Sequence, residues 1–276
     1  MNAIGIDQSC GWMKRGWHSL CRHWPEYLME AWGLGLFMTS AGLFVILMEW
    51  PGSPIHQALP HPLARRALMG SAMGLTAIAL IYSPWGQQSG AHLNPATTIA
   101  FLRLGKVKPW DALFYIIAQF CGGTLGVLLV ANVAGTVFST PPIHYAATQP
   151  GHYGPWAAWV AEFMIALGMM LMVLTLSNTP RFARLTGVGA GILVALYITL
   201  EAPISGMSMN PARSFASAAP AGIWHSLWIY FSAPPLGMLS AVEIYRRLAS
   251  RPLLSCAKLD HPVHKRCIHC GHQPPS

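Results

Sequence analysis

The chain has 276 residues, of which 53% are hydrophobic and only 9% are charged, whereas soluble domains carry about 25% charged residues. So few charges cannot cover a water-facing globule of this size, and a disordered chain is excluded because disorder requires low hydrophobicity. With 17 Lys and Arg against 9 Asp and Glu, the class that remains is an integral membrane protein with basic loops, and nucleic-acid binding is not expected.

Six apolar stretches are long enough to cross a bilayer, which needs about 20 residues of helix. The first two are residues 31–48 and 67–91, and the third and fourth share the uncharged stretch 112–161. Pro141, Pro142 and Pro150 divide that stretch into a third span, a loop and the start of a fourth span that ends near Leu176. The fifth span is predicted over 185–200 and the sixth from about 224 to 242.

Two shorter segments remain, one from Asn94 to about Leu104 and one from Asn210 to about Pro220. At roughly 10 residues, each would form a helix about 15 Å long, which is half a bilayer. Such half-helices are tolerated at membrane depth only when they are buried in protein or line a watery cavity. The predicted fold class is therefore an all-α membrane protein with six transmembrane helices and two re-entrant half-helices.

The distribution of basic residues predicts the orientation of the chain. With six spans both tails lie on one side of the membrane, and that side holds fourteen of the 17 Lys and Arg. The positive-inside rule then places both termini in the cytoplasm. Arg65 and Arg66 lie on the opposite side and do not fit the rule.

The two half-helix segments are copies of one another. Residues 89–96 read SGAHLNPA and residues 205–212 read SGMSMNPA, and each copy follows the second span of its half. Because each half has three spans, the second half enters the membrane from the other side, which makes this an inverted-topology repeat. The two half-helices are expected to meet near the membrane midplane.

The Asn-Pro-Ala triplets, Asn94-Pro95-Ala96 and Asn210-Pro211-Ala212, suit such a meeting point. Pro fits the first turn of a helix, Asn caps it and carries amide donors, and Ala permits close approach. Two facing helix N-termini each contribute about half a positive charge. Cations and protons are repelled there, while a neutral molecule can accept hydrogen bonds from the asparagines.

These motifs, together with NPARSF at 210–215 and a Glu in the first and fourth spans, resemble the aquaporin (major intrinsic protein) family over roughly residues 26–246. The resemblance implies a pore in each subunit of a homotetramer, with inverted halves of about 26–137 and 155–246 and no cofactor. Residues 1–25 and 247–276 would then be cytoplasmic tails, and the protein would lie in the plasma or inner membrane.

The resemblance also implies a selectivity filter of four positions on the outer side of the paired asparagines. Arg213 takes the charged position, and its guanidinium would repel cations and donate hydrogen bonds to the solute. The other positions fall at Ile198, where strict water channels resemble one another in having His, at Met207, and at Met73 or Gly74. Three apolar walls with one Arg depart from the water-selective pattern, although Ser214, Ala218 and the Tyr230–Phe231 pair resemble the water-channel branch.

Three further polar residues have two interpretations each. Glu30 and Glu162 lie within predicted spans, where they could form a proton relay or accept hydrogen bonds from the half-helix loops, and the second is favoured. His92 could line the inner vestibule or simply pack the loop.

The C-terminal tail contains Cys267-x-x-Cys270 with His264 and His269 nearby. This spacing is found in zinc sites, and a cytoplasmic tail would keep its thiols reduced. Metal binding by these four residues and a solvated basic tail are both open interpretations.

The favoured function is a passive channel for water and other small neutral solutes that excludes protons and ions. A broader facilitator of the glycerol, urea or ammonia class is the first alternative. An ion-coupled secondary transporter is the second, since such proteins also have inverted repeats, but it requires more ionisable residues at depth. An enzyme is not expected, because the spans contain no nucleophile–base motif.

Overall fold

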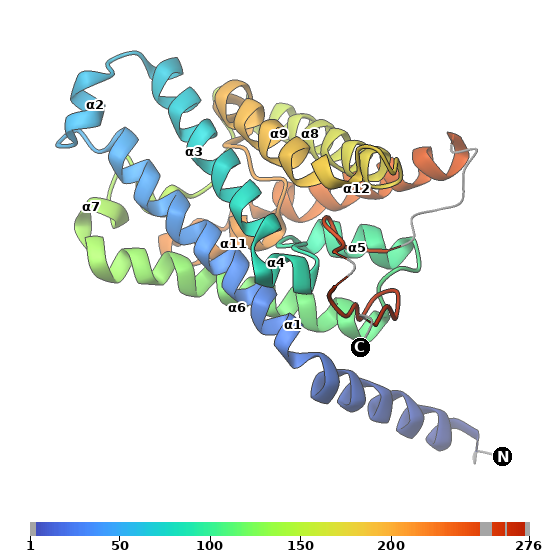
Figure 1. Ribbon diagram of the computed structural model, residues 1–276. Helices are drawn as coiled ribbons and strands as arrows, with labels where there is room; N and C mark the ends of the chain where they lie inside the picture. Colours follow the sequence, from blue (N-terminus) through green and yellow to red (C-terminus); the bar gives the residue numbers. More distant parts are fainter. Residues whose placement is uncertain (1–3, 249–255, 263, 274–276) are drawn as a thin grey trace.

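The computed structural model describes residues 4–248, 256–262 and 264–273. Within these residues all regular structure is helical, and Figure 1 shows the long helices packed side by side. In chain order the elements are α1 (Ile4–Glu49), α2 (Pro54–Ala58), α3 (Pro62–Tyr82), α4 (Pro84–Ser89), α5 (Pro95–Arg103), α6 (Pro109–Ala134), α7 (Thr136–Ser139), η1 (His144–Ala146), α8 (Gly154–Ser177), η2 (Ala183–Leu185), α9 (Thr186–Leu200), α10 (Ala202–Ser205), α11 (Pro211–Ala221) and α12 (Leu227–Leu248).

Six segments are long and apolar enough to cross a membrane: most of α1, then α3, α6 and α8, then η2 with α9, and finally α12. The prediction of an all-α protein with six spans is therefore confirmed. The two largest differences from the predicted boundaries are in the first two spans. The second span ends at Tyr82, because Pro84 starts a separate short helix whose first turn is capped by the hydroxyl of Ser83, and α1 begins well before the predicted span, at Ile4.

The half-helices are α5, with 9 residues, and α11, with 11 residues. Each lies against the last span of the other half, so that α11 packs on α6 and α5 packs on α12. Among the full spans, α1 packs on α6 in the first half and α8 packs on α12 in the second half. The two halves meet where α3 packs on α9. The two halves thus exchange equivalent contacts, as an inverted repeat requires.

Small residues make these crossings close. A Cβ added to Gly74 would lie 2.5 Å from the carbonyl oxygen of Gly191 on α9, and one added to Gly122 would lie 2.0 Å from that of Ala31 on α1. Direct backbone contact of this kind is the usual role of small residues between membrane helices.

The Arg65–Arg66 pair has polar partners inside the protein. Arg65 contacts both carboxylate oxygens of Glu49 at 3.2 Å and donates to the carbonyls of Leu59 and Pro60. Arg66 donates to the carbonyl of Thr199 at 3.2 Å. These local contacts explain why two basic residues lie on the side that the charge distribution leaves otherwise poor in them.

The described part of the C-terminal segment is folded against the bundle and is not a solvated tail. In Figure 1 this segment, drawn in red, lies beside α5. Ala257 and Lys258 are buried, at 0% and 4% exposure, and the remainder of the predicted tail, residues 249–255, 263 and 274–276, lies outside the described residues.

Candidate functional site

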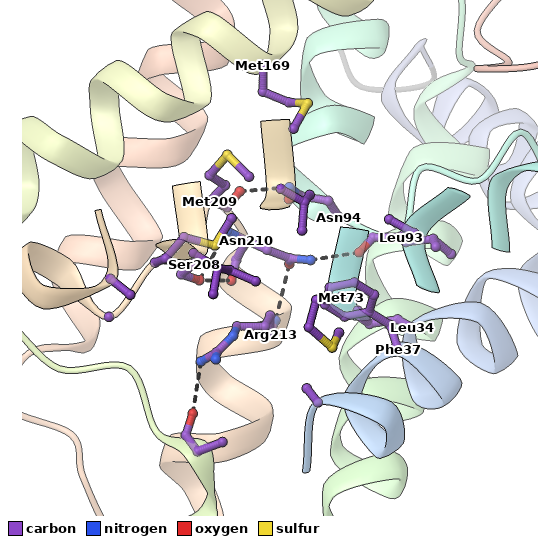
Figure 2. A pocket seen from close by; sticks show the side chains of 18 of the residues that line it. Leu34, Phe37, Met73, Leu93, Asn94, Met169, Ser208, Met209, Asn210 and Arg213 are labelled. Carbon is purple, nitrogen blue, oxygen red and sulfur yellow. Dashed lines mark hydrogen bonds between the residues drawn. The ribbon is translucent and has the colours of Figure 1, made fainter. Parts of the chain in front are cut away.

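Asn94 and Asn210 meet at the N-termini of the two half-helices. The side-chain oxygen of each caps its own helix, accepting from the backbone N–H of Ala96 at 2.8 Å and of Ala212 at 3.0 Å. The amide of Asn94 donates to the carbonyl of Met209 at 2.7 Å, and that of Asn210 donates to the carbonyl of Leu93 at 2.7 Å. Figure 2 shows these bonds crossing between the two halves. One N–H of each amide group is left for a molecule in the adjoining cavity.

Two buried carboxylates fix the loops that lead into these caps. Glu30 accepts from the backbone N–H groups of His92 and Leu93, at 3.0 and 2.7 Å. Glu162 accepts from those of Ser208 and Met209, at 2.7 and 2.6 Å. Neither carboxylate belongs to the cavity lining among the described residues, so the geometry matches loop support.

A serine and a tyrosine add further hydrogen bonds around each of these carboxylates. The sequence analysis assigned neither residue a role in the loops. The hydroxyls of Ser89 and Ser205 donate to Glu30 and Glu162 at 2.7 and 2.6 Å. Tyr115 on α6 and Tyr230 on α12 donate to the serine carbonyls, at 2.7 and 2.5 Å. The serines open both copies of the SG-x-x-x-NPA repeat, so the repeat itself carried a signal for them. The tyrosines lie far from the repeat in sequence, and no sequence pattern linked them to its loops.

Both loops hold non-glycine residues in the left-handed backbone region. The φ angles are 53° at Ala91 and 49° at Leu93 in the first loop, and 50° at Met207 and 55° at Met209 in the second. This conformation costs about 1–3 kcal/mol per residue and persists only where the surroundings enforce it. The bonds from Glu30 and Glu162 supply that enforcement.

Arg213 lies in the first turn of α11, next to Asn210. Its guanidinium donates to the carbonyl of Ala146 at 3.1 Å, and its backbone N–H donates to the side chain of Asn210 at 3.2 Å. Figure 2 places Met73 across the cavity from Arg213. Ile198 and Met207 also line the cavity, so the four predicted filter residues contribute three apolar side chains and one guanidinium to its wall.

Of the two candidates on the second span, the structure places Met73 on the cavity wall. Met73 lines the cavity, whereas Gly74 faces α9 and lies against the backbone of Gly191. The difference arises because successive residues on a helix point about 100° apart. Met73 is therefore the one of the two candidates that borders the cavity.

The four predicted filter residues and the two asparagines border one cavity of about 400 Å³. At one end its lining includes Glu49 and Arg66, and at the other it includes Ile81 and Leu259. The intervening walls are mostly apolar, and their polar residues include Asn94 and Asn210 together with His92, Thr97, Ser208 and Arg213. Such a cavity suits a small molecule that must exchange few hydrogen bonds on its way.

His92 lines the cavity and contacts the C-terminal segment. Its Nε2 is 2.7 Å from the carbonyl oxygen of Ala257, and its Nδ1 is 3.1 Å from the hydroxyl of Thr98. Its ring stacks between Phe101 and His269, with centroids 5.0 and 5.6 Å away. Burial and repulsion from His92 lower the pKa of His269 to about 4, so the ring of His269 is neutral at pH 7.

The fold and this site define a polytopic membrane protein in which two re-entrant half-helices meet beside a cavity. The family model for the major intrinsic proteins matches residues 21–245. Aquaporin NIP1-1 of Arabidopsis thaliana is 33% identical over 191 residues, which cover 67% of this chain and 64% of the relative. Aquaporin NIP2-3 of Zea mays is 31% identical over 201 residues, covering 71% of this chain and 64% of the relative.

The chain therefore belongs to the major intrinsic protein family, as its motifs predicted. The matched region spans just under two thirds of the length of these plant relatives. The X-ray structure of the aquaglyceroporin from Plasmodium falciparum aligns with a TM-score of 0.68, covering 82% of this chain and 96% of that chain at 19% identity. A likeness at that identity concerns the fold, and it confirms the predicted aquaporin-like architecture.

Proposed function

We propose that the protein is a passive transmembrane channel for water and other small neutral solutes, and that it excludes protons and ions. The observation that carries the proposal is the pair Asn94 and Asn210, held by reciprocal bonds at the converging N-termini of α5 and α11 beside the cavity. The two helix dipoles make this point electropositive. A cation would lose hydration there and gain only repulsion, whereas a neutral molecule can accept the two free amide N–H groups.

A specific observation favours solutes larger than water as a second candidate. The proposed filter combines Arg213 with Met73, Ile198 and Met207, and a wall with donors on one side and apolar groups on the others suits a molecule that has both hydroxyl and CH surfaces. The names of the relatives, aquaporin and aquaglyceroporin, are compatible with both candidates. An ion-coupled transporter is disfavoured, because among the described residues the ionisable side chains of the cavity lining are only those of Glu49, Arg66, His92 and Arg213.

The assembly and orientation proposed with this function are a homotetramer with both termini in the cytoplasm of the plasma or inner membrane. The charge distribution supports the orientation. Several spans also present large apolar side chains outward, among them Leu125 and Leu200 at 66% and 67% exposure, which lipid or neighbouring subunits would cover.

Stopped-flow light scattering on proteoliposomes tests the function. The purified protein should accelerate osmotic shrinkage over protein-free liposomes while a pH-sensitive dye reports no added proton flux. Comparison of water with glycerol, urea and ammonia distinguishes the two candidates. A proton current that scales with the water flux, or uptake that depends on a proton gradient, would refute the channel proposal.

A further inference from the structure

The C-terminal segment, residues 256–262 and 264–273, is fixed to the inner end of the cavity. The backbone N–H of Leu259 donates to the carbonyl of Gly90 at 3.2 Å, and Leu259 itself is part of the cavity wall. Lys258 donates to the carbonyl of Gln87 at 2.9 Å, and Arg266 pairs with the buried Glu26 at 2.9 Å. These contacts join the segment to α1, to α4 and to the loop before α5.

Four potential metal ligands gather in this segment: Cys256, His261, Cys267 and Cys270. One ligand atom from each lies within 4.8 Å of all the others. The sulfurs of Cys256 and Cys267 are 3.3 Å apart, and Nε2 of His261 is 3.2 Å from the sulfur of Cys270. A tetrahedral Zn²⁺ with Zn–S of about 2.3 Å and Zn–N of about 2.0 Å would hold its ligand atoms about 3.5–3.8 Å apart. The cluster is therefore close to the size that one ion requires.

The backbone around Cys267 and Cys270 turns tightly. The N–H of Gly271 donates to the carbonyl of Cys267 at 3.0 Å, and the N–H of Cys267 donates to that of His272 at 2.9 Å. Gly271 has φ = 76°, a conformation that favours glycine. This turn brings the sulfurs of Cys267 and Cys270 close together, as the binding of one metal ion by a Cys-x-x-Cys pair requires.

The cluster differs from the ligand set that the sequence predicted. Cys267 and Cys270 belong to it, but His264 is exposed, and His269 turns the other way, with its Nε2 3.2 Å from the carbonyl of Ser89. Cys256 and His261 take their places. His269 cannot serve because its ring is held between His92 and Tyr115.

We propose that Cys256, His261, Cys267 and Cys270 bind one Zn²⁺, and that this ion holds the C-terminal segment across the inner mouth of the cavity. Three thiolates and a neutral imidazole are a recognised structural zinc set. Such a site carries a net charge of −1, and the side chain of Lys258, whose Nζ donates to the carbonyl of Arg266 next to Cys267 at 3.1 Å, lies beside it to offset that charge. On the proposed cytoplasmic side the thiols stay reduced and available.

The consequence for permeation rests on the proposed channel function. While the segment is docked, Leu259 walls the inner end of the cavity and His92 is bonded to Ala257. The described part of the segment is short and contains no helix or strand, so its own fold depends on the ion, as in other small metal-bound units. Loss of zinc would release the segment, free His92 and open the inner mouth.

Metal analysis of the purified full-length protein tests the site without any transport measurement. We expect about one zinc per chain, tetrahedral cobalt absorption with thiolate charge-transfer bands after exchange, and at least a tenfold weaker zinc affinity in Cys267→Ser and His261→Ala. His264→Ala is the matched control and should bind as the wild type does. Absence of zinc binding, equal binding by Cys267→Ser, or a Cys256–Cys267 disulfide in protein prepared under cytosolic redox conditions would overturn the site.

Proteoliposome permeability tests the closure. Removal of zinc by a chelator should raise water permeability, re-addition of Zn²⁺ should lower it, and Cys267→Ser should be permeable and insensitive to both treatments. A wild-type protein that loses its zinc with no change in a measurable permeability would refute closure while leaving the site intact. If zinc binds as expected and neither the wild type nor Cys267→Ser conducts any solute, the failure belongs to the proposed channel function.

Discussion

Asn94 and Asn210 each cap one half-helix and donate a hydrogen bond into the loop that carries the other, to the carbonyls of Met209 and Leu93 at 2.7 Å. These two equivalent bonds hold the N-termini of α5 and α11 next to one another. They fix the distance between the two electropositive helix ends and the direction of the remaining amide N–H groups. Selectivity at this point then depends on a rigid arrangement that no solute has to reorganise.

Replacing Asn210 with Asp tests the electrostatic role of the pair. A carboxylate keeps the oxygen that caps α11 but has no N–H for the carbonyl of Leu93, and it places a negative charge where two helix dipoles present positive ends. We expect a cation leak that the wild type lacks, together with a several-fold loss of water permeability. Ion conductance and osmotic shrinkage should be measured on the same chelator-treated proteoliposomes.

Gln57→Glu is the matched control for that variant, since it makes the same amide-to-acid change on an exposed residue of α2. It should leave both measurements unchanged. Cation exclusion that persists in Asn210→Asp would show that the barrier lies elsewhere along the cavity.

Arg213→Val tests the charged wall of the proposed filter. A cation about 4 Å from a guanidinium is repelled by about 4 kcal/mol at an effective dielectric constant of 20. Removing that charge should therefore raise cation leakage at least tenfold and let larger neutral solutes enter the space beside Met73. Arg213→Lys keeps the charge and should keep cation exclusion.

Arg247→Val removes an equal charge from the exposed end of α12 and provides the comparison for Arg213→Val. Conductance to Na⁺ and uptake of glycerol are the measurements. Equal solute profiles for Arg213→Val and the wild type would count against the filter assignment.

Glu162→Gln tests whether this carboxylate supports a loop or relays protons. The carboxylate accepts from Ser205, Ser208 and Met209, and an amide can accept at only one of its two former oxygens. Each lost charge-assisted bond costs about 1.5–3 kcal/mol, so the melting temperature should fall by roughly 5–10 °C. Thermal unfolding in detergent measures this shift.

Glu243→Gln is the control, because that carboxylate is 39% exposed and pairs with Arg103 and Arg246; such surface pairs contribute about 0–1 kcal/mol. A relay would show the opposite pattern. Proton flux in the wild type that disappears in Glu162→Gln, with an unchanged melting temperature, would establish it.

The sequence predicted the parts of the fold that depend on local patterns. The spans follow from runs without charge, and the half-helices follow from Asn-Pro-Ala, because Asn and Pro have defined roles at the first turn. Repetition of the motif in the two halves was the signal that Asn94 and Asn210 meet. Whether Glu30 and Glu162 reach the loops was open, since it depends on how α1 and α8 lie against them.

Contacts between remote segments could not be predicted in the same way. Glu26 and Arg266 are 240 residues apart, and neither position carries a periodic or motif signal that refers to the other. The Cys-x-x-Cys pair was visible, but Cys256 and His261 are isolated in sequence, and only the path of the backbone brings them to it. His269 was a reasonable ligand by spacing, but its contacts with the ring of His92 and the carbonyl of Ser89 direct it away from the cluster.

Gly122→Ala tests the contact between α1 and α6 that positions Glu30. The added methyl carbon would lie 2.0 Å from the carbonyl oxygen of Ala31 and 2.5 Å from its Cα, and because both atoms are backbone, α1 would have to move away. Overpacking of this kind costs about 1–3 kcal/mol or more, so we expect a melting temperature several degrees lower and reduced water permeability. Gly11→Ala, on α1, has no atom within 4 Å of the new Cβ and should match the wild type or exceed it slightly. Unaltered stability of Gly122→Ala would mean that α1 and α6 are less tightly joined than their contact distances imply.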